Sequence, residues 1–307
     1  MITADHHFEL LPEVDASDGA TFGIGLHMGL DENGFAPGST DWATQDGENG
    51  QTGTTAFGRD RLLGPVWSWQ LHVNRTDESE ALETLRAFRR DWHWINGRGE
   101  PGKVTALRYQ LDGKQRRIYG RPRRFEAPPD NKILSGYVPV SVDFKCVDGF
   151  SYDDVMSSVS MLLGEELEAP GVNSGGGFIF PVTFPVTTLP PTRRQTQIKI
   201  GGDAPAYPII RFEANAGALA NPGLITDSWR IDIDYTIPEG QYIEVDTRPW
   251  VMTVMLNGSA SIGGKIGPRQ RLSKMSFSPG RFEGRFIGSS GGVATCHVRW
   301  ANTYNSY

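Results

Sequence analysis

The clearest fold signal in the chain lies in residues 105–120, which read TALRYQLDGKQRRIYG. Two runs of alternating apolar and polar side chains flank Asp112-Gly113. An Asp-Gly pair between such runs is a strong short-range signal of a β-hairpin, because both residues tolerate the backbone that a tight hairpin turn requires. The pattern predicts antiparallel strands at 105–111 and 115–120, and therefore an antiparallel sheet around them.

A single helix is predicted just before this hairpin. Asp77 is followed three residues later by Glu80, as in a capping box, and Leu85, Phe88 and Trp92 recur at helical spacing. Acidic side chains precede basic ones along the other face, which suits the helix dipole. The sequence therefore predicts a helix over 77–92.

Alternating or apolar segments predict further strands at 21–28, 66–73, 138–146, 155–163 and 178–186. Residues 31–56 are rich in Gly, Asp, Asn, Ser and Thr and have little to bury, so we expect a long acidic loop or arm there. Trp67 and Trp69 share a strand face, which leaves open whether they belong to the core or to an interface.

From residue 198 onward, short alternating segments recur without any helix-period window. They predict a β-sandwich or jelly roll with strands at 207–213, 229–237, 241–247, 250–256, 272–278, 282–287 and 293–300. The expected domains are a first β-rich domain at 1–190, a linker at 191–200 around Pro190-Pro191, and the sandwich at 201–307. The predicted fold class is mainly β, with one α-helix in the first domain.

Composition narrows the class of protein. The 307 residues include 37 glycines and 20 prolines, which argues against a helix bundle. No apolar run approaches the ~20 residues of a membrane-spanning helix, and the start has no leader-like segment, so we expect no membrane insertion. Cys146 and Cys296 lie far apart, which excludes a disulfide scaffold and favours a reduced environment.

Charge is segregated along the chain, and the segregation suggests an interface. Residues 1–60 hold eleven acidic side chains and one basic side chain, Arg59, whereas residues 114–124 are strongly basic. Complementary charge steers association between two surfaces. The candidate interface residues are Asp41, Asp46 and Glu48 on the acidic segment and Arg116, Arg117, Arg121, Arg123 and Arg124 on the basic one. The arginines also fit a solvated hairpin edge or a surface facing nucleic acid.

Motifs that would support an enzyme are incomplete. Gly23 and Gly25 lack the third glycine of a dinucleotide-binding turn, and Gly264-Lys265 lacks the rest of a phosphate loop. Asp232 and Asp234 share a strand face but also suit the polar outside of a sandwich. We therefore expect no enzymatic activity, no catalytic residues, no cofactor and no metal.

The order of these features resembles distal tail proteins, also called minor tail proteins, of long-tailed siphovirus-type phages, particularly those of actinobacterial hosts. The resemblance covers roughly residues 60–300. It is carried by the helix 77–92, by the hairpin end at 116–122, by the strand end at 143–150, and by sandwich segments that include Asn221-Pro222, Gly240, Asn257-Gly258 and Trp300. It implies a galectin-like second domain.

The resemblance also implies a structural role in the virion tail after assembly in the host cytoplasm. Its expected form is a ring of six copies that joins the tail tube protein to tail-tip or baseplate hub proteins and lets DNA pass through the lumen. The alternative is a carbohydrate-binding adhesion module that recognises host-surface glycan. Galectins use His-x-Asn-Pro-Arg, whereas Asn221-Pro222 here stands between Ala220 and Gly223, which favours a docking or spacer module. A polysaccharide-active enzyme is the third class considered.

Overall fold

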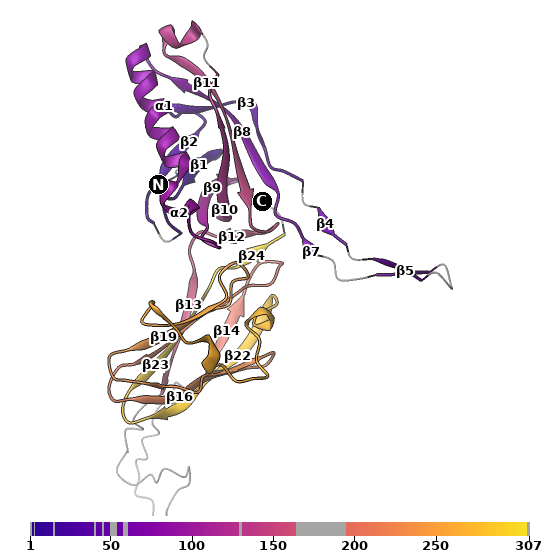
Figure 1. Cartoon of the computed structure of the whole chain (residues 1–307), viewed down its shortest axis with the longest axis vertical. Helices are drawn as coiled ribbons and strands as arrows, with labels where there is room; N and C mark the ends of the chain where they lie inside the picture. The colour runs from indigo at the N-terminus through magenta and orange to yellow at the C-terminus, as the bar shows by residue number, and fades with distance from the viewer. Residues whose placement is uncertain are drawn as a thin grey trace, which may run out of the picture. The chain divides into compact units, whose positions relative to one another are not determined.

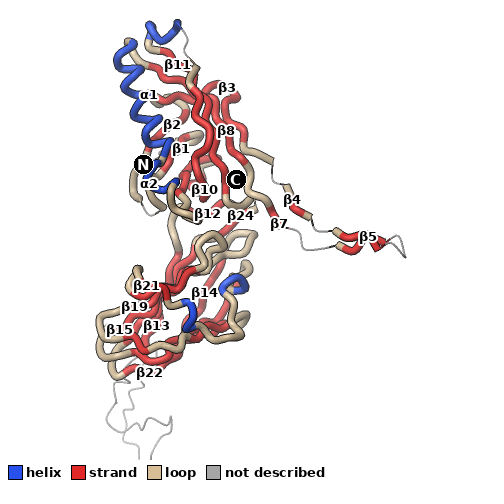
Figure 2. Tube along the Cα trace, viewed as in Figure 1, coloured by secondary structure: helices blue, strands red, loops and turns tan. Residues whose placement is uncertain are grey.

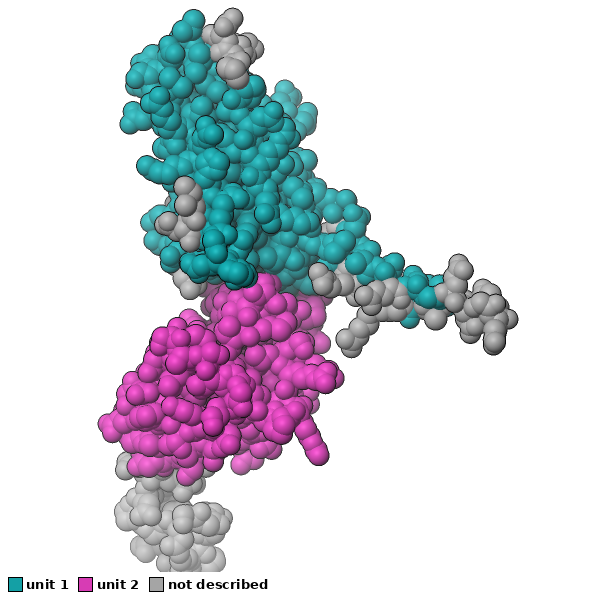
Figure 3. Space-filling view, viewed as in Figure 1, with its two compact units in different colours: residues 1–154, 303–307 teal, residues 155–302 magenta. Residues whose placement is uncertain are grey.

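The computed structural model describes residues 2, 4–14, 16–39, 41–44, 46–49, 54–57, 61–128, 131–163 and 195–305. Strands dominate these residues (Figure 2), as the sequence predicts. The chain forms two compact units, Met1–Asp154 with Thr303–Tyr307 and Val155–Asn302 (Figure 3). Within the described ranges, no helix has the length and apolar character to cross a membrane.

Unit 1 is built on a closed seven-stranded barrel (Figure 1). Its strands pair in the order β11-β8-β3-β2-β1-β9-β10, and β10 pairs back to β11. Beyond β10, β12 and β24 extend the sheet. The bounds are β1 (His7–Leu10), β2 (Ala20–Gly23), β3 (Met28–Ala36), β8 (Val66–Asn74), β9 (Thr105–Leu111), β10 (Lys114–Glu126), β11 (Tyr137–Cys146), β12 (Ser151–Asp153) and β24 (Thr303–Tyr304).

The barrel and one helix share an aromatic core. Helix α1 (Glu78–His93) buries Phe88 and Trp92, and Trp92 meets Trp69 and Phe22 edge-on at centroid distances of 6.2 and 5.9 Å. Trp69 is fully buried, so the tryptophans of β8 belong to the core. Edge-to-face aromatic pairs add to the hydrophobic gain of burial. The core fixes α1 against the barrel.

The helix and the hairpin form where the sequence predicts them. Asp77 caps α1 by accepting a hydrogen bond from the Glu80 amide at 3.0 Å. Asp112 and Gly113 take φ of 51° and 68° in the turn between β9 and β10. A four-residue helix α2 (Ile95–Arg98) follows α1, and a 3₁₀ helix η1 (Asn131–Ser135) precedes β11.

The predicted single strand over 21–28 is wrong. β2 ends at Gly23, and β3 begins at Met28. Gly25 adopts φ 75°, and a Cβ on Gly23 would lie 2.3 Å from the His6 carbonyl oxygen. The two glycines therefore turn the chain between two strands, and Ile24 is exposed at the turn.

The described residues between β3 and β8, which are 37–39, 41–44, 46–49, 54–57 and 61–65, form a hairpin-like arm. It contains two short antiparallel ladders, β4 (Trp42–Ala43) with β7 (Arg61–Leu62), and β5 (Gly47–Asn49) with β6 (Thr54–Ala56). The predicted acidic arm thus has ladder structure. Figure 1 draws it leaving the barrel on the side away from α1.

Unit 2 is a sandwich of two antiparallel sheets around a continuous apolar core. One sheet has the order β13-β23-β15-β19-β20-β21, and the other β14-β22-β16-β17 with β18 beside β16. The bounds are β13 (Ser157–Leu163), β14 (Gln195–Ile200), β15 (Ile209–Ala214), β16 (Leu219–Thr226), β17 (Arg230–Asp232), β18 (Thr236–Ile237), β19 (Tyr242–Asp246), β20 (Thr253–Leu256), β21 (Ala260–Ser261), β22 (Gly280–Ser290) and β23 (Ala294–Trp300).

One expected strand and the expected domain boundary differ from the sequence prediction. Residues 272–274 form the 3₁₀ helix η3 rather than a strand, and a second 3₁₀ helix, η2, spans Gly263–Lys265. The units divide at Asp154 rather than at 191–200, and residues 303–304 pair within unit 1. The expected strand at 178–186 and linker residues 191–194 lie outside the described residues, while 195–200 form β14.

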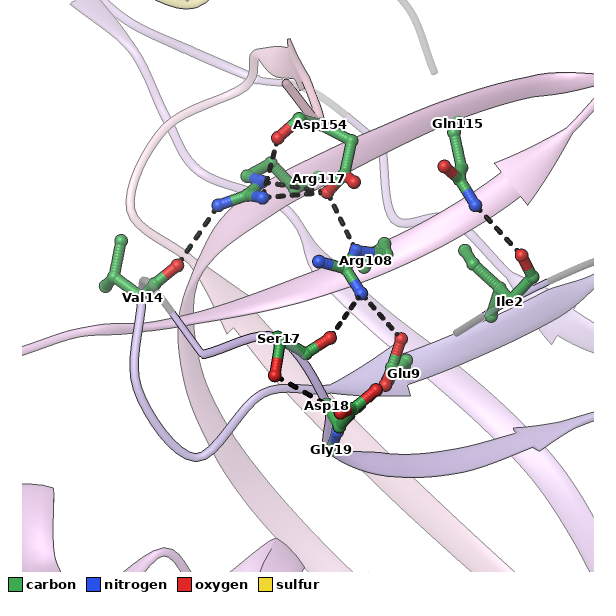
Figure 4. A network of polar contacts seen from close by, with 10 residues as sticks. All are labelled: Ile2, Glu9, Val14, Ser17, Asp18, Gly19, Arg108, Gln115, Arg117 and Asp154. Carbon is green, nitrogen blue, oxygen red and sulfur yellow. Dashed lines mark hydrogen bonds and ion pairs between the residues drawn. The ribbon is translucent and has the colours of Figure 1, made fainter. Parts of the chain in front are cut away.

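A buried ion-pair network lies on unit 1 where three strands run side by side. Glu9 of β1 is opposite Arg108 of β9, which is opposite Arg117 of β10. Arg108 donates to Glu9 at 2.9 Å and to Asp154 at 2.8 Å, and Arg117 donates to Asp154 at 2.9 Å. Figure 4 shows Asp154 between the two guanidinium groups, whose repulsion it offsets.

The network is electrically balanced and well hydrogen-bonded. It pairs two carboxylates with two guanidinium groups. Arg108 also donates to the Ser17 carbonyl oxygen at 3.1 Å, and Arg117 donates to the carbonyl oxygens of Val14 at 3.1 Å and Asp154 at 2.6 Å. Burial alone would lower the pKa of Arg108, but Asp154 and Glu9 raise it above its ordinary value. The network therefore ties β1, its following loop and the end of unit 1 together.

Asp154→Ala should lower the free energy of unfolding of unit 1 by about 3–5 kcal/mol, because it leaves two buried arginines without their shared counter-charge. Urea denaturation with hydrogen exchange of the β9 and β10 amides measures this loss. Glu126→Ala, which removes an exposed partner of Arg124, is the control and should stay close to wild type. Equal free energies of unfolding for Asp154→Ala and Glu126→Ala would contradict a stabilising role of the buried ion-pair network.

Asp148 makes unit 1 sensitive to pH. Burial raises the pKa of Asp148 to about 6, although hydrogen bonds from Tyr152 Oη at 2.7 Å and the Phe150 amide at 3.1 Å favour the anion. A folded-state pKa above the unfolded value means that this group's stabilisation is present at low pH and is lost as pH rises through about 6.

Asp148→Asn should therefore raise the melting temperature of unit 1 relative to wild type by a few degrees more at pH 8 than at pH 5, measured by calorimetry. Asp112→Asn, on a side chain that is 94% exposed, is the matched control. Its difference from wild type should be the same at both pH values. A pH-independent effect of Asp148→Asn would refute the expectation.

Candidate protein–protein interface

A cluster of basic side chains covers one end of α1 and the adjoining end of β10; we call it the basic cluster. Trp92 Nε1 of α1 donates a hydrogen bond to the Arg124 carbonyl oxygen at 2.9 Å, and Arg98 of the adjoining α2 donates one to the Pro122 carbonyl oxygen at 2.9 Å. Its members are Arg89, Arg90, His93, Arg98, Arg121, Arg123 and Arg124.

The charges in the basic cluster are close enough to repel one another. Partial burial lowers the pKa of Arg98, and the positive charges of Arg123 and Arg121 lower it further. Arg89, Arg90, Arg123 and Arg124 are exposed. A surface of unlike sign would therefore relieve repulsion by covering this cluster.

A β-bulge positions the two most C-terminal arginines of β10. The register with β11 shifts between Pro122 and Phe125, so Arg123 and Arg124 have no direct partner in β11. Phe125 turns back towards the helix, with Arg89 over its ring at 5.8 Å. Bulges re-aim side chains in this way, and here the result is a pair of exposed arginines beside the last turn of α1.

Arg121 has a different environment from its neighbours. It donates to the carbonyl oxygens of Lys103 and Glu100, each at 2.6 Å, and its guanidinium lies 5.9 Å from the Trp94 ring centroid. Arg121 therefore holds the 100–103 loop against the strand while contributing charge to the cluster.

The arginines of the basic segment predicted at 114–124 lie in two separate environments in the structure. Arg117 belongs to the buried network, and Arg116 stacks over Tyr304 at 3.9 Å and donates to Ser151 at 3.3 Å. Arg121, Arg123 and Arg124 are brought together with the helix arginines, which the sequence analysis did not include. Of the added members, Arg90 and His93 lie in the last turn of α1, Arg89 lies just before it, and Arg98 lies in α2.

The acidic candidates lie on the arm. Asp41 and Asp46 are exposed, and Glu48 is opposite Thr55 in the β5–β6 ladder. The arm also exposes two aromatic side chains, Trp42 at 61% and Phe57 at 84%. Isolated exposed apolar residues are common, but two large aromatics on a projecting arm are typical of an interaction surface.

A cavity of about 520 Å³ opens beside the basic cluster. Apolar side chains line it, including Leu10, Leu11, Pro12 and Trp94. Its charged lining residues are two cationic ones, Arg90 and Lys103, and two acidic ones, Glu13 and Asp91. Trp94 has φ 44° between the two helices and donates through Nε1 to the Pro12 carbonyl oxygen at 2.6 Å. A second cavity of about 500 Å³ continues along α1 and shares Ala20 and Asp91 with the first.

Asp232, a polar candidate of the sequence analysis, is hydrogen-bonded within unit 2. Asp232 accepts hydrogen bonds from Arg230 at 2.6 Å and Gln270 at 2.7 Å. Among the residues that the structure describes, no group of three His, Cys, Asp or Glu side chains is arranged to hold a metal ion. Cys146 and Cys296 are buried free thiols, and burial raises the pKa of both.

Known proteins share this fold. The chain matches the SPP1 Dit (gp 19.1) protein, from the hub adsorption apparatus of phages that infect Gram-positive bacteria, with a TM-score of 0.51 and 12% identity over 96% of this chain and 98% of that one. It also matches chains of the phage P2 baseplate in its activated conformation. With calcium the TM-score is 0.55 at 10% identity, and with strontium 0.56 at 11%, each over 95% of this chain and 97% of that one.

No protein-family profile and no curated protein sequence matches the chain. The likeness is one of fold, and it spans nearly the full length of each compared chain.

The two native thiols should be inert in the folded protein, because the thiolate is the reactive form and burial disfavours it. Ellman's reagent should label neither Cys146 nor Cys296 in buffer and both in guanidinium chloride. Leu134→Cys, at a position 71% exposed, is the reactive control. Rapid labelling of a native thiol would contradict the burial described here.

Proposed function

We propose that the chain is a structural, non-enzymatic protein of a phage tail tip. The observation that carries this proposal is the near full-length likeness of fold to a Dit protein and to baseplate chains. In the proposed role, copies of the chain form a ring, expected to contain six, at the distal end of a siphovirus-type tail tube. The ring joins the tube to tip or hub proteins and leaves a lumen for DNA.

Ring formation requires each copy to present two different surfaces. A head-to-tail contact between unlike surfaces generates a closed ring when the rotation between copies closes. The arm and the basic cluster are two such surfaces, since they carry opposite charge and lie on different parts of unit 1. Opposite charge on two different surfaces of each copy is what a heterologous contact between copies requires.

In this proposal, Asp41, Asp46 and Glu48 of one copy lie against the basic cluster of the next. The contact is assigned to Arg121, Arg123 and Arg124, because Arg116 and Arg117 are engaged inside unit 1. Exposed charge pairs add little affinity but accelerate encounter and fix register. Charge therefore guides assembly rather than holding the ring by itself.

Replacing Arg121, Arg123 and Arg124 together with Glu should reduce the fraction of protein in the ring, most strongly at low salt, because like charges then face the acidic arm. Salt screens exposed charges over about 8 Å at physiological ionic strength, so added salt should weaken assembly of the wild type and relieve part of the defect in the variant. Sedimentation velocity and native mass measured across a salt series test this.

The matched control reverses three exposed arginines of unit 2, Arg269, Arg271 and Arg281, which gives the same change in net charge. It should assemble like wild type. A ring mass and salt response unchanged by the first variant, or equally changed by both, would reject the basic cluster as an interface.

A further inference from the structure

We propose that the open edge of β13 in unit 2 binds an extended segment of another tail protein, which joins the six-stranded sheet as an added strand. This inference rests on the proposed role in a tail tip. It assigns a contact to unit 2 that is separate from the charged surfaces of unit 1.

β13 is the outermost strand of the sheet β13-β23-β15-β19-β20-β21. It pairs with β23 without a register shift, from Ser157 opposite Trp300 to Leu163 opposite Ala294. In the part of unit 2 that the structure describes, no other strand pairs with β13. The side of β13 that faces away from β23 is therefore an open edge of seven residues.

Hydrogen bonds of the neighbouring strands show which backbone groups of β23 face β13. The Asn215 amide donates to the Val293 carbonyl oxygen at 3.0 Å, so the backbone of Val293 is directed towards β15. Ala214, which is opposite Ala294, instead donates to the Gln241 carbonyl oxygen at 3.1 Å, on the far side of β15. Successive residues of an antiparallel strand alternate in direction. Ala294 and every second residue after it in β23 therefore face β13.

The same alternation fixes the backbone groups that β13 presents at its open edge. The residues of β13 opposite the inward-facing residues of β23 are Ser157, Val159, Met161 and Leu163. These residues bond to β23, so the intervening three direct their amide and carbonyl groups away from it. The groups at the open edge are those of Ser158, Ser160 and Leu162.

Nothing in the sequence of β13 protects this edge. Residues 157–163 read SSVSMLL, without a charged residue, a proline or a glycine, and the ladder with β23 contains no bulge. Folded proteins protect open edges with charges, prolines, bulges or very short strands. β13 has none of these devices.

The other described edge strands of unit 2 are protected in these ways. At the far end of the same sheet β21 has two residues, and β17 of the second sheet has three. β14, at the opposite edge of the second sheet, places the charged Lys199 at an exposed position. β13 is the exception among them, as expected of an edge that a partner covers.

The chemistry of the edge selects an extended polypeptide as the partner. Amide and carbonyl groups that recur at every second residue match another extended backbone, as in strand addition by peptide-binding domains. Met161 and Leu163 are buried on one face of β13, whereas Ser158 and Ser160 are exposed on the other. The added strand should therefore alternate apolar residues, which extend the core, with polar ones.

The proposed ring favours a different protein over another copy of this chain. Two β13 edges that pair with each other form a contact between identical surfaces. A head-to-tail ring instead brings unlike surfaces together, and the proposed contact between copies uses unit 1. The open edge is thus left for a neighbouring protein of the tail.

Hydrogen–deuterium exchange of the full-length protein, read residue by residue by mass spectrometry, tests the proposal. In the purified protein, the amides of Ser158, Ser160 and Leu162 should exchange fast. In purified tails that contain the protein, they should exchange about tenfold more slowly, because an added strand engages them. The amides of the central strand β15 are the internal reference and should exchange equally in both samples.

A proline variant separates strand addition from other ways of covering the edge. Ser160→Pro removes one outward amide and no hydrogen bond to β23, since an edge strand accommodates proline where its N–H faces away from the sheet. Tails that contain Ser160→Pro should lose the slow exchange at Ser158 and Leu162. Ser160→Ala keeps the amide and should retain the slow exchange. Both variants should keep the circular dichroism spectrum and native mass of the wild type.

The contrary results distinguish failure of the inference from failure of the proposed function. Fast exchange of the three amides in tails that contain the protein, or slow exchange that survives Ser160→Pro, overturns strand addition and leaves the tail role standing. Slow exchange already in the purified protein shows that the chain or its own copies cover the edge, and overturns the assignment to another protein. Absence of the protein from purified tails overturns the proposed function and the tail partner with it.

Discussion

The rest of unit 1 depends on the closure of its barrel by β11. This strand pairs with β8 on one side and β10 on the other, so seven strands complete a cylinder, and β12 and β24 extend the sheet beyond β10. Closure removes the exposed backbone donors and acceptors that make edge strands prone to uncontrolled pairing. It also fixes the two places from which the proposed contacts arise, the end of β8 that continues the arm and the end of β10 that adjoins α1.

In the proposed assembly, copies meet through side chains of the arm and of the basic cluster. These two surfaces carry opposite charge. Large exposed aromatics such as Trp42 and Phe57 carry a cost for an isolated chain, since they favour non-specific association. Their placement on an acidic arm disfavours contact with other acidic surfaces.

Local features of this fold were predictable and non-local ones were not. The Asp112-Gly113 turn and the capped helix follow from residues within a few positions of each other, and the structure has both. The closure of the barrel and the return of residues 303–304 depend on partners far away in sequence. The basic segment split because β10 is thirteen residues long, so Arg116 and Arg124 lie near opposite ends of one strand.

The most direct test of head-to-tail assembly is electron cryo-microscopy of the purified protein at a resolution that resolves the arm. We predict a closed ring with one rotation axis, in which every arm contacts the α1 side of the adjacent copy in the same sense. Two-fold symmetric dimers with identical surfaces in contact, or a ring whose arms touch no neighbouring copy, would contradict the account.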